Sequence, residues 1–217
     1  MRLSEYLKSN FYDANELCAL IKIEHEQLHM WQENSIFPNA SYSIENLIKC
    51  SSYLGLYECV EVTDYYPRGA LDWGQMLVKH AVEHSSHAYE LFQNKYITVL
   101  KACADKGVFS EDDKFGDDVI EHIQQVWQQF LCSKYGVISQ NGTVEEVVFI
   151  DLGRSIVDTL TDDRTSNNIP SEHRLLLHEA LKLLNKALSY NAAHEQQDSL
   201  RYKYIDSVIQ KYDLSVR

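Results

Sequence analysis

Apolar residues recur at helical spacing along most of this chain. Many of them lie three or four positions apart with polar residues between them, which is the pattern of a helix that buries one face. We therefore predict seven helices, at about residues 14–34, 43–58, 72–104, 117–135, 144–161, 171–191 and 195–213. Only three prolines and eight glycines interrupt the 217 residues, which argues against an all-β design. The predicted fold class is all-α, a single-domain bundle of about seven helices.

The last two predicted helices resemble the helical hairpin that tetratricopeptide repeats stack against one another. They cover residues 171–191 and 195–213, and no second copy of the pair occurs at a repeat period. A chain of this length can bury one core without a second domain. We expect a single helical domain over residues 1–217, with a main bundle at 1–160 and a C-terminal hairpin at 171–213 packed on it.

Two of the predicted helices begin with side chains that can cap a helix. Thr143 and Glu146 have the spacing of a capping box in front of an apolar run, which places a helix start at residue 144. Asp72 and Gln75 form a looser version of the same pattern. Both pairs support the helix starts that the apolar spacing predicts.

The charge of the chain limits its partners. Thirty-two acidic residues against 20 basic ones give a formal net charge of −12, with a pI near 5.1. This field repels the phosphates of nucleic acids and of anionic lipids, so we expect neither nucleic acid nor membrane as a partner. The same field favours encounter with a protein that has a basic surface.

The cysteines and the N-terminal region bear on location. The five cysteines are odd in number and show no C-x-x-C spacing, so we expect neither a disulfide framework nor a cysteine zinc site. Charged and amide residues interrupt every short apolar run at the N-terminus, and no later stretch is long enough to span a bilayer. The prediction is a cytoplasmic protein without signal peptide or membrane segment.

One candidate for metal chemistry is the string H-E-x-x-H at residues 25–29. On a helix, His25 and His29 share a face, so both could bind one zinc ion while Glu26 polarises a bound water. The string resembles the zincin metalloprotease signature, which implies a zinc site of this kind. The resemblance covers five residues, with no strand pattern before His25 and no third histidine of the metzincin type after His29.

A second candidate lies in the predicted helix at 72–104. His80, His84 and His87 share its apolar stripe, where a helix buries its side chains. Glu24 lies at the centre of the stripe of the helix at 14–34. If the two stripes face each other, these four residues form a ligand set like those of helical di-iron and zinc proteins, with His25 and His29 on its flank. Buried histidines that are only hydrogen-bonded are the other interpretation.

Two functions follow, and the sequence leaves the choice between them open. The favoured one is an acidic protein-binding module of the immunity or inhibitor type, which neutralises a basic toxin or nuclease. The charge, the 14 tyrosines and the lack of a complete catalytic motif support it. The alternative is a helical metalloprotein, a zinc- or iron-dependent oxidase or hydrolase with its site in the bundle core. The sequence gives no catalytic residue, partner, substrate or oligomeric state.

Overall fold

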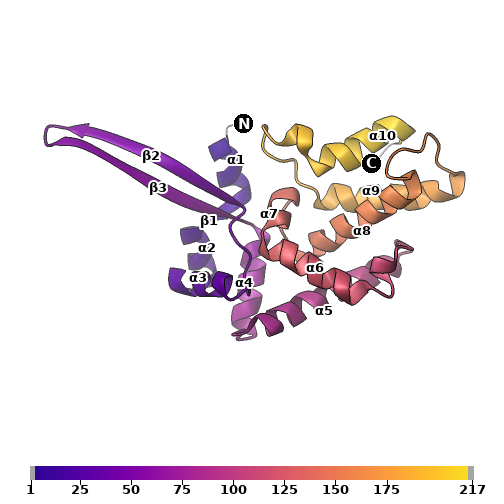
Figure 1. Cartoon of the computed structure of the whole chain (residues 1–217), viewed down its shortest axis with the longest axis horizontal. Coiled ribbons are helices and arrows are strands. Elements are labelled where there is room, and N and C mark those ends of the chain that lie inside the picture. The colour runs from indigo at the N-terminus through magenta and orange to yellow at the C-terminus, as the bar shows by residue number, and fades with distance from the viewer. Residues whose placement is uncertain (1–2, 215–217) are drawn as a thin grey trace.

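The computed structural model describes residues 3–214 and shows a mixed α/β fold. Within residues 3–214, ten α-helices surround a main core and a small second apolar cluster, and a three-stranded antiparallel sheet extends from them (Figure 1). Short 3-10 turns and one π-helical segment, Tyr202–Asp206, complete the described part of the chain. The order of helices and strands is α1 (Leu3–Asn10), β1 (Phe11–Asp13), α2 (Ala14–Ile21), α3 (His25–Glu33), β2 (Tyr42–Ser52), β3 (Gly55–Pro67), α4 (Gly69–Lys79), α5 (Ser85–Ala104), α6 (Val119–Leu131), α7 (Lys134–Ile138), α8 (Val144–Thr161), α9 (Arg174–Ala187) and α10 (Ser207–Tyr212).

The sheet overturns the prediction of an all-α fold with about seven helices. Residues 43–58, which were expected to be helical, form β2 and the beginning of β3. Ile44, Leu47 and Ile48 have the spacing i, i+3, i+4, and this spacing suggested a helix. Farther along, Tyr57 is aromatic and Val60, Val62 and Thr63 are β-branched, and these residue types favour a strand.

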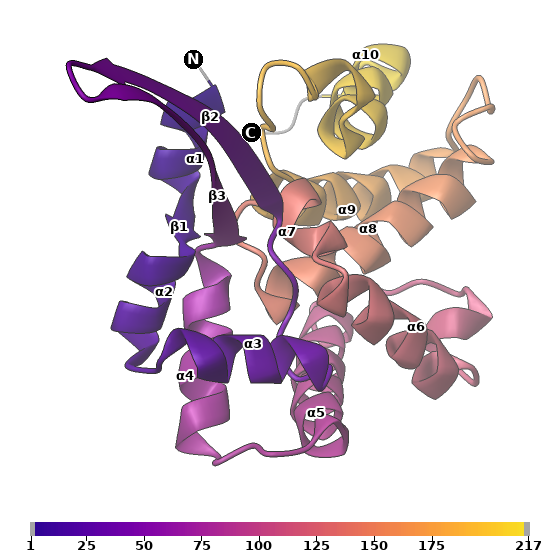
Figure 2. The ribbon, with the colours of Figure 1, turned by 60° about the vertical axis from the view of Figure 1, so that its left-hand side comes forward.

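The hairpin of β2 and β3 projects far beyond the helices. The sheet order is β1-β3-β2, and the short β1 pairs only with the base of β3. β2 and β3 pair without interruption from Tyr42 and Tyr65 to Ser52 and Gly55, and a two-residue turn joins them. In both ribbon views the far end of the hairpin points away from the rest of the chain (Figures 1 and 2). We call this hairpin, residues 42–67, the arm.

Two predicted long helices are each broken into two. The expected helix at 14–34 is interrupted at Lys22, which adopts a left-handed backbone with φ of 68° and ends α2. The expected helix at 72–104 begins earlier, at Gly69, and is interrupted around Ala81, where φ is 47°. Neither break contains a glycine or a proline, so the usual sequence signals of a helix end are missing. The apolar residues on each side of a break still reach the same core because the chain turns there.

Helix α8 is the centre of the core, and its bounds confirm the predicted helix at 144–161. Thr143 Oγ1 accepts a hydrogen bond from the backbone N–H of Glu146, and the Glu146 carboxylate accepts one from the backbone N–H of Thr143. This is the capping box that the sequence predicts. Eleven of the 18 residues of α8 are buried, since α5 and α9 pack against it.

The close packing of α8 on α9 depends on Gly153. A Cβ atom on Gly153 would lie 2.7 Å from Cγ of Leu184 and 3.2 Å from the carbonyl oxygen of Ala180. We expect Gly153→Val to lower the free energy of unfolding by about 1–3 kcal/mol, because the added methyl groups force the helices apart. Gly153→Ala should cost less, since it adds one methyl group and improves helix propensity. Urea denaturation of both variants measures the difference, and equal stabilities of wild type and Gly153→Val would contradict the prediction.

The C-terminal region is not the predicted hairpin of two regular helices. Of residues 171–191, the stretch Arg174–Ala187 forms α9. Residues 195–213 form a 3-10 turn, a π-helical segment and the six-residue α10 in place of one helix. The tetratricopeptide-like hairpin is therefore wrong, because the second helix lacks the regular geometry that repeat stacking requires. No helix within residues 3–214 is long and apolar enough to cross a membrane.

Candidate functional site

The structure does not bring the predicted histidine cluster together. Because the chain turns between α4 and α5, His80 lies just after α4 and His84 just before α5, and both side chains are exposed. His87 is half-buried in the first turn of α5. Glu24, the expected fourth ligand, is exposed at the start of α3. Their shared stripe existed only under the assumption of one continuous helix.

The H-E-x-x-H string keeps its helical spacing but gains no third ligand. His25 and His29 are one turn apart on α3. His25 is held at the surface, where its Nε2 lies 2.9 Å from Oδ1 of Asn15, and the side chains of Glu26 and His29 are exposed. Among residues 3–214, no group of three or more histidine, cysteine, aspartate or glutamate side chains is placed to hold a metal ion.

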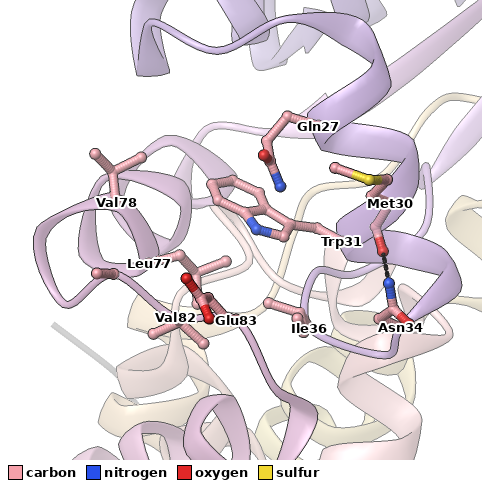
Figure 3. Close-up of a pocket in the computed structure, with 10 residues that line it drawn as sticks. Gln27, Met30, Trp31, Asn34, Ile36, Leu77, Val78, Val82 and Glu83 are labelled. Carbon is pink, nitrogen blue, oxygen red and sulfur yellow. Dashed lines mark hydrogen bonds between the residues drawn. The ribbon is translucent and has the colours of Figure 1, made fainter.

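A groove of about 380 Å³ lies between α3 and the turn that follows α4 (Figure 3). Its floor is apolar, and the indole ring of Trp31 points into it from α3. Met30 and Val78 are half exposed on its two sides, and Glu83 is the single charged residue in the lining. The groove can accommodate one apolar side chain of another molecule, but it holds no arrangement of groups suited to catalysis. The residues lining it are Gln27, Met30, Trp31, Asn34, Ile36, Leu77, Val78, Ala81, Val82 and Glu83.

A largely buried carboxylate on α8, that of Asp151, joins three helices; its side chain is 15% exposed. Asp151 Oδ2 accepts hydrogen bonds from the hydroxyl of Tyr96 on α5 and from Nε2 of His122 on α6, each at 2.5 Å. Burial, together with the negative charge of Asp151, holds the pKa of Tyr96 well above its ordinary value, so the phenol stays protonated and donates. The sequence pattern gave this site no role, although a charged residue inside the apolar stretch of α8 is a signal for one.

The same face of α8 carries a second polar cluster toward the C-terminal segment. The hydroxyl of Tyr204 donates to Oδ2 of Asp158 at 2.9 Å, and the guanidinium groups of Arg154 and Arg164 lie over the Tyr204 ring, 5.0 and 4.4 Å from its centre. These contacts tie the π-helical segment to α8. In the Asp151 cluster the polar atoms bond one another, which is the arrangement of structural contacts between helices. In the second cluster, Nε of Arg154, Oδ1 of Asp158 and Nη1 of Arg164 are buried without a hydrogen-bond partner among residues 3–214.

The most unusual surface belongs to the arm. Tyr53 and Leu54 at its tip are almost fully exposed, at 103% and 92%. Five more large apolar side chains along the two strands are more than half exposed: Leu47, Leu56, Tyr57, Val60 and Val62. Leu47, Leu56, Val60 and Val62 lie on one face of the arm and Tyr57 lies on the other, because neighbouring strand residues point to opposite sides.

The arm is also acidic. It holds four carboxylates, Glu45, Glu58, Glu61 and Asp64, against the single ammonium group of Lys49. Lys49 Nζ lies 3.0 Å from Oε1 of Glu58, its cross-strand partner, so its charge is already compensated within the hairpin. The remaining carboxylates give the arm the same sign of charge as the whole chain.

The base of the arm is held firmly. The side chains of Tyr42, Ile44 and Tyr65 pack on a small apolar cluster formed by Tyr6, Leu7, Phe11 and Ala192. The hydroxyl of Tyr42 donates to Oε2 of Glu195 at 2.9 Å, and burial and this carboxylate raise the pKa of Tyr42. On the other side, the guanidinium of Arg68 stacks over the Tyr12 ring at 4.0 Å. These contacts fix the base of the arm to the helices and thereby determine the direction in which the arm projects.

The chain belongs to a protein family, DUF6058, that is described as a family of unknown function, and residues 88–213 match it. The match runs from α5 to α10 and includes Tyr96, His122 and Asp151. The arm and the groove beside α3 precede the matched residues. No curated protein and no solved structure matches the chain.

Proposed function

We propose that this protein acts by binding another protein, and that the arm is its binding element. The observation that carries the proposal is the set of seven large apolar side chains that the arm exposes. Monomeric proteins rarely expose a continuous apolar patch of more than a few hundred Å², and a patch above that size marks a binding site. A two-stranded hairpin is also only marginally stable alone, so contact with a partner would stabilise the distal part of the arm.

The proposed partner has a basic surface. The arm carries four carboxylates, of which only Glu58 is paired with a lysine in the arm. The chain as a whole carries a net charge of −12. Apolar side chains between acidic ones suit a partner whose apolar patch is surrounded by lysine or arginine, because the opposite charges speed encounter and orient the contact. An immunity or inhibitor protein that covers the basic surface of a toxin or nuclease is the specific form of this proposal.

Site-specific crosslinking in cells tests it. A photoreactive amino acid replaces Val60 on the arm in one variant and Leu175 on α9 in a matched one; the two side chains are 58% and 73% exposed. We expect position 60, and not position 175, to crosslink to one protein of basic pI. The purified partner should then bind wild type with a dissociation constant that rises with salt. Equal crosslinking from both positions, or a partner of acidic pI other than a second copy of this chain, would overturn the proposal.

A charge on the arm should weaken this binding. We expect Val60→Asp to raise the dissociation constant by at least about tenfold, because it places a carboxylate inside the apolar contact. Leu175→Asp is the control and should leave the constant unchanged, since Leu175 lies on α9. Titration calorimetry with the purified partner measures both. An unchanged constant for Val60→Asp, with the fold intact by circular dichroism, would exclude the arm as the contact.

A further inference from the structure

The outer edge of β2 is open along its whole length. In the sheet order β1-β3-β2, β2 is an edge strand, and within residues 3–214 no strand pairs with its free side. The 11 pairs between β2 and β3 follow one register without a bulge, and β2 contains no proline. A lysine can protect such an edge, but Lys49 is engaged with Glu58. Long edges without protection are templates for another strand.

The register shows which backbone groups are free. A two-residue turn connects Ser52 to Gly55, so these two residues form a hydrogen-bonded pair. Hydrogen-bonded and non-hydrogen-bonded pairs alternate along an antiparallel ladder. The N–H and C=O groups of every second residue therefore point away from β3: Ser43, Glu45, Leu47, Lys49 and Ser51.

The sequence of these five residues is complementary to itself. Read from either end, it places a serine outermost, a charged residue next and Leu47 in the centre. When two copies of β2 pair antiparallel about Leu47, each Glu45 faces Lys49 of the second copy and each Ser43 faces Ser51 of the second copy. The two leucines meet on the symmetry axis.

We propose that two copies of this chain associate through their β2 edges, antiparallel and centred on Leu47. The result is a continuous four-stranded sheet with the order β3-β2-β2-β3 and two-fold symmetry. The five outward residues of each copy form about ten backbone hydrogen bonds, two for each hydrogen-bonded pair. That number matches the hydrogen bonds of a typical specific interface.

The side-chain rows of this sheet support the chosen register. Leu47 already pairs with Val60, so the central row contains Val60 and Leu47 of both copies and is entirely apolar. In the next row, Lys49 lies between its own Glu58 and Glu45 of the second copy, so one lysine compensates two carboxylates. These contacts oppose the repulsion between two acidic chains.

Other registers lose the charge pairing. An axis at Glu45 or at Lys49 places like charges opposite one another, which destabilises the pair. An axis at Asn46 sets Glu45 against Leu47, and an axis at Ile48 sets Glu45 against Ser51. Only the axis at Leu47 makes both Glu45–Lys49 contacts.

This association goes beyond the proposed binding of a basic protein and uses a different part of the arm. Edge pairing takes the backbone groups of β2, whereas the apolar and acidic side chains stay on the two faces of the enlarged sheet. The two proposals can therefore fail separately. A monomeric protein that still crosslinks to a basic partner from position 60 would refute only the pairing, and a dimer without such a partner would refute only the binding.

Analytical ultracentrifugation of single-charge variants tests the pairing and its register. Wild type should sediment as a dimer, and Lys49→Glu and Glu45→Lys should each weaken dimerisation at least about tenfold, because each sets like charges together twice. Mixed in equal amounts, the two variants have opposite charges at both contacts and should form a heterodimer. Circular dichroism confirms that each variant is folded.

A proline at the axis gives an independent test. Leu47→Pro removes an outward N–H and leaves the hydrogen bonds to β3 in place. It should therefore raise the dissociation constant of the dimer at least about tenfold without loss of the hairpin. Wild type that remains monomeric at 100 μM would overturn the proposal. A dimer that all three substitutions leave intact, or the absence of a heterodimer in the mixture, would overturn it as well.

Discussion

Replacing Phe92 by alanine is expected to lower the free energy of unfolding by about 3–5 kcal/mol. The Phe92 side chain is fully buried on α5 and contacts three aromatic neighbours from α4 and α6. Its ring centre lies 5.1 Å from those of Trp127 and Phe130, and 6.4 Å from that of Trp73. Removing the ring leaves a cavity where these helices meet, and the lost contacts add to the lost burial.

The aromatic cluster also provides the measurement. Trp73 and Trp127 both contact Phe92, so their fluorescence reports unfolding of this region during urea denaturation. Phe109→Ala is the matched control, because the Phe109 side chain is half exposed and its loss should change the stability by less than about 0.5 kcal/mol. Equal midpoints for the two variants would show that the aromatic cluster does not determine the stability of the core.

The sequence predicts an element best where burial and local signals agree. Helix α8 was predicted at its observed bounds, since Thr143 and Glu146 mark its start and an apolar stretch follows. Its burial against α5 and α9 requires the apolar positions that the pattern detects. Local capping and packing against the core therefore lead to the same boundary.

The arm could not be predicted in this way, because no core lies behind its distal part. A strand with one buried face alternates between apolar and polar residues, whereas β2 exposes side chains on both faces. Because no buried face requires this alternation in β2, the spacing of Ile44 and Leu47 can match that of a helix by chance. The signals that were present were weaker ones, namely Gly55 at the turn and the β-branched residues of β3.

The structure separates the predicted histidine cluster for a related reason. A helical projection places His80, His84 and His87 on one stripe only if the helix continues through residue 81. Ala81 instead has a positive φ, which is uncommon for alanine and which the sequence therefore does not predict. Tertiary packing of α4 and α5 determines the turn, so a pattern read along one segment cannot detect it.

Asp151→Ala is expected to lower the free energy of unfolding by about 3 kcal/mol. Its carboxylate accepts from Tyr96 and from His122, and the side chains of His122 and Asp151 are both only 15% exposed. Loss of the carboxylate removes the acceptor of the Tyr96 hydroxyl, and the Tyr96 side chain is fully buried. One substitution thus weakens the contacts among α5, α6 and α8 at once.

A double-mutant cycle with Tyr96→Phe separates the hydrogen bond from the general effect of a smaller side chain. Tyr96→Phe alone removes the donor and keeps the ring, so it should cost less, about 1–2 kcal/mol. If the two groups stabilise each other, the double variant should be more stable than the sum of the single costs predicts, by about 1 kcal/mol or more. Additive costs in urea denaturation would mean that the Tyr96–Asp151 contact contributes nothing of its own. Helix α8 packs on both α5 and α9. Loss of the Asp151 carboxylate should therefore also speed amide hydrogen exchange in α5 and α6. Exchange in the arm should be affected later, because the arm joins the body at a separate apolar cluster.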